Sequence, residues 1–283
     1  MMSQVLVSDT LQEWQETAAY WTKHRHVIRA MFAPLTRALI KQANIVQGES
    51  VLDVAGGAGE PSLTIAQAVG PLGFVMCTDP IAEMLAAAEQ EALSRGLENV
   101  QFRQCTADSL PFKNDLFDVA VSRLGVMFFP DPFAGLREML RVIKPGGRIA
   151  LAVWDKSERN PYSYLVTQVV SRHVASSPVD PDAPDAFRFA EPGKLAAILK
   201  EAGAIDIGEC VVEFDIAAPL SPEDFWAFRS EISEVLRKKL RNLSSDEKAR
   251  IADEVQDAVK EFFPGGHMRF PARMIIVCAA KPI

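Results

Sequence analysis

Short apolar runs alternate along the chain with segments of helical periodicity. The runs predict buried strands at residues 50–53, 74–78, 100–105, 117–122 and 148–154. Between these runs apolar residues recur at helical spacing, as at Leu63, Ala66 and Val69. Strands that alternate with helices in this way are typical of an α/β fold, with a mainly parallel sheet and helices on both faces.

The C-terminal part follows a different pattern. Two more strands are predicted at residues 207–214 and 273–280, and the segment between them holds two strongly charged helical patterns, Ser221–Leu240 and Ser245–Phe262. A connection of this length indicates a helical cap over the carboxyl edge of the sheet. The predicted organisation is an N-terminal helical segment at 1–45, a core at 46–215, the cap at 216–270 and a last core strand at 271–283.

The N-terminal segment carries an unusual number of aromatic and imidazole side chains. We expect residues 1–10 to be frayed, a helix over Leu11–Ala30, a break at Phe32–Pro34 and a second helix over Leu35–Ala43. The first helix contains Trp14, Tyr20, Trp21, His24 and His26. Two interpretations remain open: a lid over a binding site, or an amphipathic helix docked on the sheet edge.

A glycine-rich stretch joins the first strand to the following helix. It runs Asp53-Val54-Ala55-Gly56-Gly57-Ala58-Gly59, with Pro61 at the expected start of the helix. Glycines permit positive φ and let a ligand approach the backbone, and the helix start offers free N–H groups. No Gly-Lys-Ser/Thr follows, which excludes a Walker phosphate loop, and the glycine spacing differs from the G-x-G-x-x-G of dinucleotide-binding proteins.

The second strand ends at Asp79-Pro80, beside this turn. A carboxylate here can accept both hydroxyl protons of a ribose bound across the turn. The alternative is that Asp79 only caps the following helix.

Several short motifs together resemble one family. They are the turn with Asp53, the acid Asp79, the segment Thr106-Ala107-Asp108-Ser109-Leu110-Pro111-Phe112, the strand Phe117–Val121 and the turn Lys144-Pro145-Gly146-Gly147. In this order they resemble the core of class I S-adenosylmethionine (SAM)-dependent methyltransferases, notably the ubiquinone/menaquinone-biosynthesis type and small-molecule natural-product enzymes. The resemblance implies a Rossmann-like sheet of seven strands with the last antiparallel, and SAM as cofactor. Ala55 and Thr106 depart from the pattern, because the family usually has glycine at the first position and an acidic or amide residue at the second.

The resemblance, with the carboxyl ends of the strands, implies a set of cofactor-binding residues. These are Asp53, Ala55, Gly56, Gly57, Gly59, Asp79, Pro80, Met84, Thr106, Ala107, Asp108, Ser122 and Arg123. Whether Thr106 or Asp108 contacts adenine is left open, and Arg123 either faces the ligand or pairs with a structural carboxylate.

Methyl transfer needs alignment, a dry pocket and, for some acceptors, a base. The base candidates taken forward are Tyr20, His24, His26 and His267, and His173 is a further histidine considered for the role. Candidate substrate-binding residues are Trp21, Phe128, Trp154, Asn160 and Tyr162. The expected activity is methyl transfer from SAM to the O, N or C of a small aromatic or apolar molecule. The alternative is a SAM-binding protein of the same fold that does not methylate.

Composition and charge limit the kinds of partner that the protein is expected to bind. The formal net charge of −7 argues against nucleic acid, and no apolar run is long enough for a membrane span. The early acidic residues argue against a signal peptide, and the four widely spaced cysteines indicate free thiols in the cytoplasm. No metal-ligand spacing is evident. A dehydrogenase or a nucleic-acid methyltransferase fits less well, and the oligomeric state is not predicted.

Overall fold

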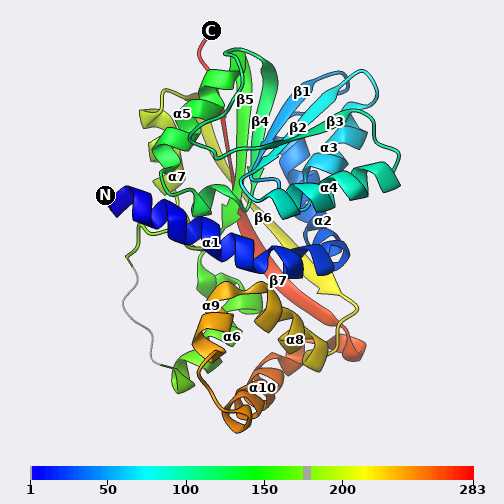
Figure 1. The fold of residues 1–283 in the computed structure, drawn as a ribbon, viewed down its shortest axis with the longest axis vertical. Helices are drawn as coiled ribbons and strands as arrows, with labels where there is room; N and C mark the ends of the chain where they lie inside the picture. The colour runs from blue at the N-terminus through cyan, green and yellow to red at the C-terminus, as the bar shows by residue number, and fades with distance from the viewer. Residues whose placement is uncertain (1, 175–179) are drawn as a thin grey trace.

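A mixed sheet forms the centre of the molecule, as Figure 1 shows. The structure is a computed structural model that describes residues 2–174 and 180–283, with side chains from residue 11 onward. Within these residues seven strands lie in the order β3-β2-β1-β4-β5-β7-β6. Their bounds are β1 Ser50–Val54, β2 Phe74–Asp79, β3 Val100–Gln104, β4 Phe117–Arg123, β5 Ile143–Trp154, β6 Ile205–Ala218 and β7 Met268–Ala280.

The first five strands are parallel, whereas β7 is antiparallel to both of its neighbours, β5 and β6. The central strands β1 and β4 are buried on both faces, which explains their nearly continuous apolar sequences. The predicted Rossmann-like methyltransferase sheet is thereby confirmed.

Helices cover both faces of the sheet. The described helices are α1 Met2–Lys23, α2 Arg25–Gln42, α3 Ser62–Val69, α4 Ala82–Ser94, α5 Pro132–Val142, α6 Pro161–His173, α7 Lys194–Glu201, α8 Pro222–Ile232, α9 Glu234–Leu240 and α10 Ser245–Val259. Local sequence sets several starts. The Asp131 side chain accepts from Ala134 N ahead of α5, and Ser244 and Glu247 form a capping box ahead of α10.

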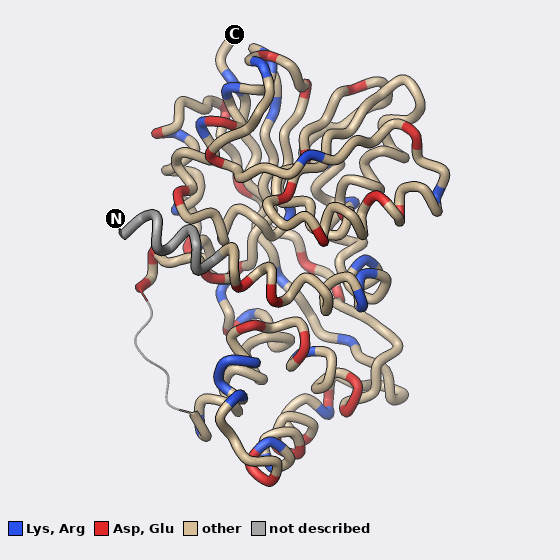
Figure 2. The backbone as a smooth tube through the Cα atoms, in the orientation of Figure 1, with Lys and Arg blue, Asp and Glu red and all other residues tan. Residues whose placement is uncertain are grey.

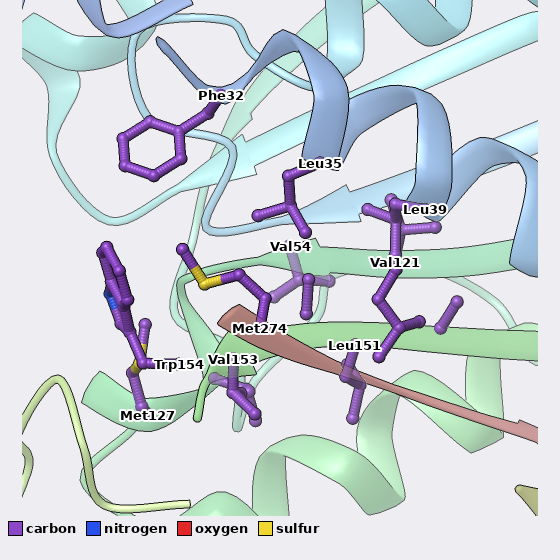
Figure 3. Close-up of a cluster of buried hydrophobic side chains, with 14 of the residues drawn as sticks. Phe32, Leu35, Leu39, Val54, Val121, Met127, Leu151, Val153, Trp154 and Met274 are labelled. Atoms are coloured by element: carbon purple, nitrogen blue, oxygen red, sulfur yellow. The ribbon is translucent and has the colours of Figure 1, made fainter. Parts of the chain in front are cut away.

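The predicted break at Pro34 is wrong. Helix α1 begins at Met2 rather than near Leu11, the chain breaks at His24, and α2 then runs through Pro34 to Gln42. Proline inside a helix removes one hydrogen bond at a cost of about 3 kcal/mol. Burial of the apolar face of α2 outweighs this loss: Leu35 and Leu39 point at the sheet in Figure 3, toward residues that include Val121 and Leu151.

The strands β6 and β7 are longer than predicted and carry the cap. They pair from Ile205↔Ala280 to Ala218↔Met268, well beyond the predicted ends at Phe214 and Arg273. The first cap helix was expected to be continuous from Ser221 to Leu240. It is broken at Ser233, whose hydroxyl accepts from Leu236 N and starts α9. Helix α6, which follows β5 in sequence, packs against α10. We use "cap" for α6 and α8–α10, and "lid" for α1.

The lid lies between the sheet and the cap. In Figure 1 it crosses the molecule below the carboxyl ends of β1, β2 and β4, and the cap lies on its other side. The lid packs against α4 of the core and α8 of the cap. Any ligand at the strand ends is therefore covered by α1. Residues 175–179 lie outside the described residues.

Candidate functional site

The glycine-rich turn leaves open space beside Gly57. At Gly56 an added Cβ would lie 2.7 Å from Cys77 Sγ and 2.8 Å from Asp53 Oδ2, and at Gly59 it would lie 2.9 Å from Leu63 Cδ1. At Gly57, which has a φ of +57°, it would meet nothing within 4 Å. Close packing therefore explains Gly56 and Gly59, whereas the backbone of Gly57 borders open space that a ligand can approach.

Ala55 adopts the left-handed backbone that glycine favours. Its φ is +59°, a conformation that costs a residue with Cβ about 1–2 kcal/mol. Gly125 makes room for this side chain, because an added Cβ there would lie 2.7 Å from Ala55 Cβ. The departure at Ala55 therefore leaves the shape of the turn intact.

Asp79 joins the end of β2 to the turn. Its Oδ2 accepts from Gly57 N at 2.9 Å and its Oδ1 accepts from Ile81 N at 2.9 Å. Burial raises the pKa of Asp79 to about 6. Each carboxylate oxygen keeps a further lone pair, so Asp79 can hold the backbone and accept from ligand hydroxyls as well.

Asp53 lies beneath the turn. Ser62 Oγ donates to its Oδ2 at 2.5 Å, and its Oδ1 has no partner among the described residues. Burial raises the pKa of Asp53 to about 7, and burial also raises that of the neighbouring Cys77. The carboxyl thus supports the turn from within. Ser62 escaped the sequence analysis, because its distance to Asp53 depends on how the turn closes.

Ser122 and Arg123 end β4 below the same turn. Ser122 is buried, and its hydroxyl has no partner in the described part of the chain. The Arg123 guanidinium donates to Thr36 Oγ1 at 2.7 Å and to the Glu60 carbonyl at 3.0 Å. Arg123 therefore ties α2 to the turn, an interaction that periodicity alone does not reveal.

The segment after β3 reaches the other side of Asp79. The Cys105 N–H donates to the Asp79 carbonyl at 3.3 Å. Thr106 and Ala107 are partly exposed, Asp108 is exposed, and the side chains of Thr106 and Asp108 have no hydrogen bond among the described residues. Both side chains are free to bind a ligand, and the choice between them stays a prediction.

The lid covers the turn with apolar side chains. Ala18 packs with Ile81 and Met84, and Ala58 of the turn lies against this cluster. The Trp14 ring meets Phe128 edge-on at 5.0 Å. Trp21 packs in the same region, and its Nε1 is a buried donor without a partner in the described structure. Pro80 is half-buried beside them.

Aromatic rings continue from the lid into the cap. Trp154, at the end of β5, stacks on Tyr162 at 6.2 Å and meets Phe32 edge-on at 6.0 Å. The Arg229 guanidinium lies 4.4 Å from the Tyr162 ring, and burial raises the pKa of the Tyr162 phenol. Sequence analysis missed Arg229, because nothing in a charged helix marks which arginine faces inward.

The side chain of Asn160 makes its hydrogen bonds to backbone atoms. Its Nδ2 lies 3.1 Å from the carbonyl oxygens of Asp155, Lys156 and Arg273, and its Oδ1 accepts from Arg273 N at 2.8 Å. These bonds fasten the loop after β5 to β7. Both N–H groups of this side chain are used by the backbone and the residue is fully buried, so its observed contacts are structural, and a role in substrate binding stays a prediction.

The four base candidates do not form one cluster. His24 Nε2 lies 2.6 Å from Glu231 Oε2, and the Arg237 guanidinium lies 5.1 Å from the Tyr20 ring, so both residues face the cap. His26 is exposed, 3.9 Å from Glu91, and His267 is exposed at the start of β7. Residue His173 pairs with Glu254 inside the cap at 3.0 Å.

The described residues contain neither a metal-binding cluster nor a membrane-spanning helix. No group of three or more His, Cys, Asp or Glu side chains there is arranged to hold a metal ion. No helix among them is long and apolar enough to cross a membrane.

Known proteins resemble both the sequence and the fold. An uncharacterized protein of Mycobacterium tuberculosis is 38% identical over 138 residues, 48% of this chain and 49% of that one. The ubiquinone/menaquinone biosynthesis C-methyltransferase UbiE of Cupriavidus metallidurans is 32% identical over 177 residues, 58% of this chain and 70% of that one. The crystal structure of the YcgJ protein of Bacillus subtilis has a TM-score of 0.57 at 21% identity, covering 88% of this chain and 98% of that one.

The alignment spans about half the length of the mycobacterial relative. A model of the ubiE/COQ5 methyltransferase family matches residues 30–173, from α2 through α6. The match includes the glycine-rich turn, Asp79 and the segment after β3. With half of the sequence matched and the sheet in the expected order, the chain belongs to the ubiE/COQ5 methyltransferase family, for which the cofactor is S-adenosylmethionine.

Proposed function

We propose that this protein transfers a methyl group from SAM to a small aromatic or apolar molecule enclosed by the lid and the cap. The observation that carries the proposal is the hydrogen bond between Gly57 N and Asp79 Oδ2, beside open space at the strand ends. It brings the turn and the carboxylate of a nucleoside site together at one place.

The residues at this place fit the cofactor. Asp79 accepts from the ribose hydroxyls, Gly57 lets the nucleoside approach the backbone, and Thr106 or Asp108 contacts the adenine. The unpartnered hydroxyl of Ser122 offers a further polar group at the end of β4. SAM, when bound, supplies a methyl group already activated on a sulfonium. The chain then has to align the acceptor and exclude water.

The aromatic side chains favour an apolar acceptor. Trp21 and Phe128 pack next to the lid, and Trp154 stacks on Tyr162 of the cap helix α6. Rings of this kind bind flat apolar molecules through area and edge-to-face contact. The unpartnered Nε1 of Trp21 provides one hydrogen-bond donor for an oxygen of the acceptor.

The base is expected in the lid or in the turn that follows it. Tyr20 and His24 face the cap, whereas His26 and His267 are exposed. If His24 takes a proton from a phenol or an activated ring carbon, the carboxylate of Glu231 would stabilise the resulting imidazolium. His24→Asn and Tyr20→Phe should be compared by pH–rate profile, because loss of the acidic limb in only one of them identifies the base.

Binding and turnover test the proposal separately. Calorimetry with S-adenosylhomocysteine, with NAD as control, should give micromolar affinity for the first alone. A screen with tritiated SAM and a panel of phenols, quinols and amines should then yield labelled product that enters an organic phase. Binding without turnover over the whole panel would favour the alternative, a SAM-binding protein that does not methylate.

Two finer points belong to the same proposal. The acceptor is a small molecule rather than nucleic acid, which is supported by the net charge of −7, and salt-dependent binding to RNA would contradict it.

A cytoplasmic location is supported by four cysteines that are all free thiols, and recovery of the native protein from a membrane or secreted fraction would contradict it.

A further inference from the structure

A second cavity lies among α2, α3 and α4. Its volume is about 470 Å³, and its lining includes Arg29, Thr36 and Arg37 of α2, Glu60 before α3, Glu91 of α4 and Arg95 just after α4. This cavity adjoins the proposed cofactor site, because Glu60 directly follows the glycine-rich turn and Arg123 bonds both Thr36 and Glu60. It opens between helices, whereas the proposed cofactor site lies at the strand ends.

Positive charge exceeds negative charge around this cavity. The buried carboxylate of Glu91 has three guanidinium neighbours, Arg95 Nε at 2.9 Å, Arg25 Nε at 3.5 Å and Arg29 Nη1 at 3.6 Å, and the His26 imidazole lies 3.9 Å away. Burial opposes ionisation of Glu91, yet the hydrogen bond and charge of Arg95 keep its pKa below the usual value. One carboxylate cannot neutralise three guanidinium groups.

The second carboxylate does not restore the balance. Glu60 pairs with Arg95 at 2.9 Å and accepts from Thr64 Oγ1 at 2.6 Å. Arg37, which also lines the cavity, has no hydrogen bond or ion pair in the described part of the chain. The chain as a whole carries a net charge of −7. A concave site whose lining holds three arginines against two carboxylates, with Arg37 unpaired among the described residues, therefore favours an anion.

We propose that this cavity binds the phosphate group of a small ligand, held between Arg29 and Arg37 with Arg95 at its inner end. Arg29 and Arg37 lie on one face of α2, two turns apart, and both open on the cavity. A guanidinium group forms paired hydrogen bonds with phosphate oxygens. A phosphate offers acceptor oxygens to several arginines at once, whereas a carboxylate ligand offers only one edge. A phosphate therefore fits this cavity better than a carboxylate. The volume also leaves room for an organic part of the ligand.

Inorganic phosphate is the first probe, measured by calorimetry and by the thermal unfolding midpoint. The test variant is the double substitution Arg29→Gln/Arg37→Gln. Its matched control is Arg241→Gln, an exposed arginine at the end of α9. The wild type and the control should bind phosphate equally, and the double variant should bind at least tenfold more weakly. Equal binding by all three proteins, or the same midpoint shift with chloride at equal ionic strength, would overturn the proposal.

Two further probes separate the possible sources of the phosphate. Glycerol 3-phosphate represents a soluble ligand, and phosphatidylcholine vesicles with and without phosphatidylglycerol represent a lipid headgroup. Binding of glycerol 3-phosphate alone identifies a soluble ligand, and binding of the anionic vesicles as well identifies a headgroup. Weaker binding of either probe by the double variant supports the proposed site. Failure of both phosphate compounds to bind contradicts it. None of these measurements depends on methyl transfer.

Discussion

The N–H of Gly57 donates to Asp79 Oδ2 at 2.9 Å, which fastens the glycine-rich turn to the end of the neighbouring strand. The second carboxylate oxygen of Asp79 holds Ile81 N at the start of α4. The helix-start contact that the sequence left as one alternative is present, and the ribose role stays a prediction for which each carboxylate oxygen keeps a lone pair. The carboxylate is positioned before any cofactor arrives, which lowers the ordering cost of binding.

Asp79→Asn should weaken binding of S-adenosylhomocysteine at least tenfold. Asparagine keeps the size of the side chain and one acceptor oxygen, but it loses the charge and one of the two acceptors for ribose hydroxyls. Calorimetry measures the affinity, and urea denaturation confirms the fold. Glu83→Gln, an exposed acid in the first turn of α4, is the control and should bind normally. Unchanged affinity in Asp79→Asn would remove the ribose assignment.

Gly56→Ala and Gly57→Ala should both destabilise the fold but differ in their effect on cofactor affinity. At Gly56 the new methyl group meets Cys77 Sγ and Asp53 Oδ2 at less than contact distance, so we expect a loss of about 1–3 kcal/mol in the free energy of unfolding. At Gly57 the cost is only backbone strain of about 1–2 kcal/mol. The methyl group there projects into the open space and should reduce cofactor affinity more than in Gly56→Ala.

Gly208→Ala is the matched control, because Gly208 has ordinary φ and no neighbour within 4 Å of an added Cβ. Urea denaturation and calorimetry on the three variants separate strain from blocking. A Gly57→Ala protein with full cofactor affinity would place the nucleoside elsewhere.

Asp53 should make stability depend on pH. Its pKa of about 7 in the folded protein, raised by burial, compares with about 3.9 in an unfolded chain. The folded state therefore retains a proton that the unfolded state releases, and this contribution to the free energy of unfolding is lost as pH rises from about 4 through 7. Asp53→Asn removes the titration. Relative to wild type, the variant should gain about 2–3 kcal/mol between pH 5 and pH 8.

Urea denaturation at the two pH values checks this result. Asp118→Asn serves as the control: burial opposes ionisation of Asp118, but Lys144 and Ser50 lower its pKa, so it stays ionised over the whole range. A relative stability of Asp53→Asn that does not change with pH would show that the carboxyl is already ionised at pH 5.

The ion pairs between lid and cap should control opening of the lid. Glu231 of α8 accepts from Lys23 Nζ at 2.8 Å and lies 2.6 Å from His24 Nε2. Exposed pairs contribute about 1 kcal/mol or less. Glu231→Gln should therefore speed hydrogen exchange in residues 11–23 about two- to fivefold. Glu254→Gln, which removes a pair inside the cap, should leave that exchange unchanged. Equal exchange in both variants would mean that Glu231 does not hold α1, which packing and the contacts of Arg237 and Lys238 would then secure.

The core of the fold follows from local sequence. Continuous apolar runs, the glycines of the first turn and the acid at Asp79 set strands, turn and ligand edge without help from distant residues. Features that depend on distant contacts did not follow. Helix α2 continues through Pro34 because the sheet buries its apolar face, and α8 ends at Ser233 because a hydroxyl caps the next helix.

The candidate site also combines features set by local sequence with features set by distant contacts. The backbone cradle and Asp79 were predicted from spacing. The partner of Arg123 is Thr36, from a helix that precedes β4 by many residues, and the partner of His24 is Glu231 in the cap. These pairs join segments that only the folded chain brings together. Asn160, expected to bind substrate, makes its hydrogen bonds to the backbone of its own loop and of β7.

The position of α1 has a kinetic consequence. Helix α1 contacts both the strand-end cluster and the cap, so if the cofactor and the acceptor bind as proposed, a single movement of this helix opens both sites. Exchange of the nucleoside and exchange of the acceptor then share one step in each catalytic cycle. If this step is slow, acceptors of very different nucleophilicity will be methylated at nearly the same maximal rate, and that rate will fall as solvent viscosity rises.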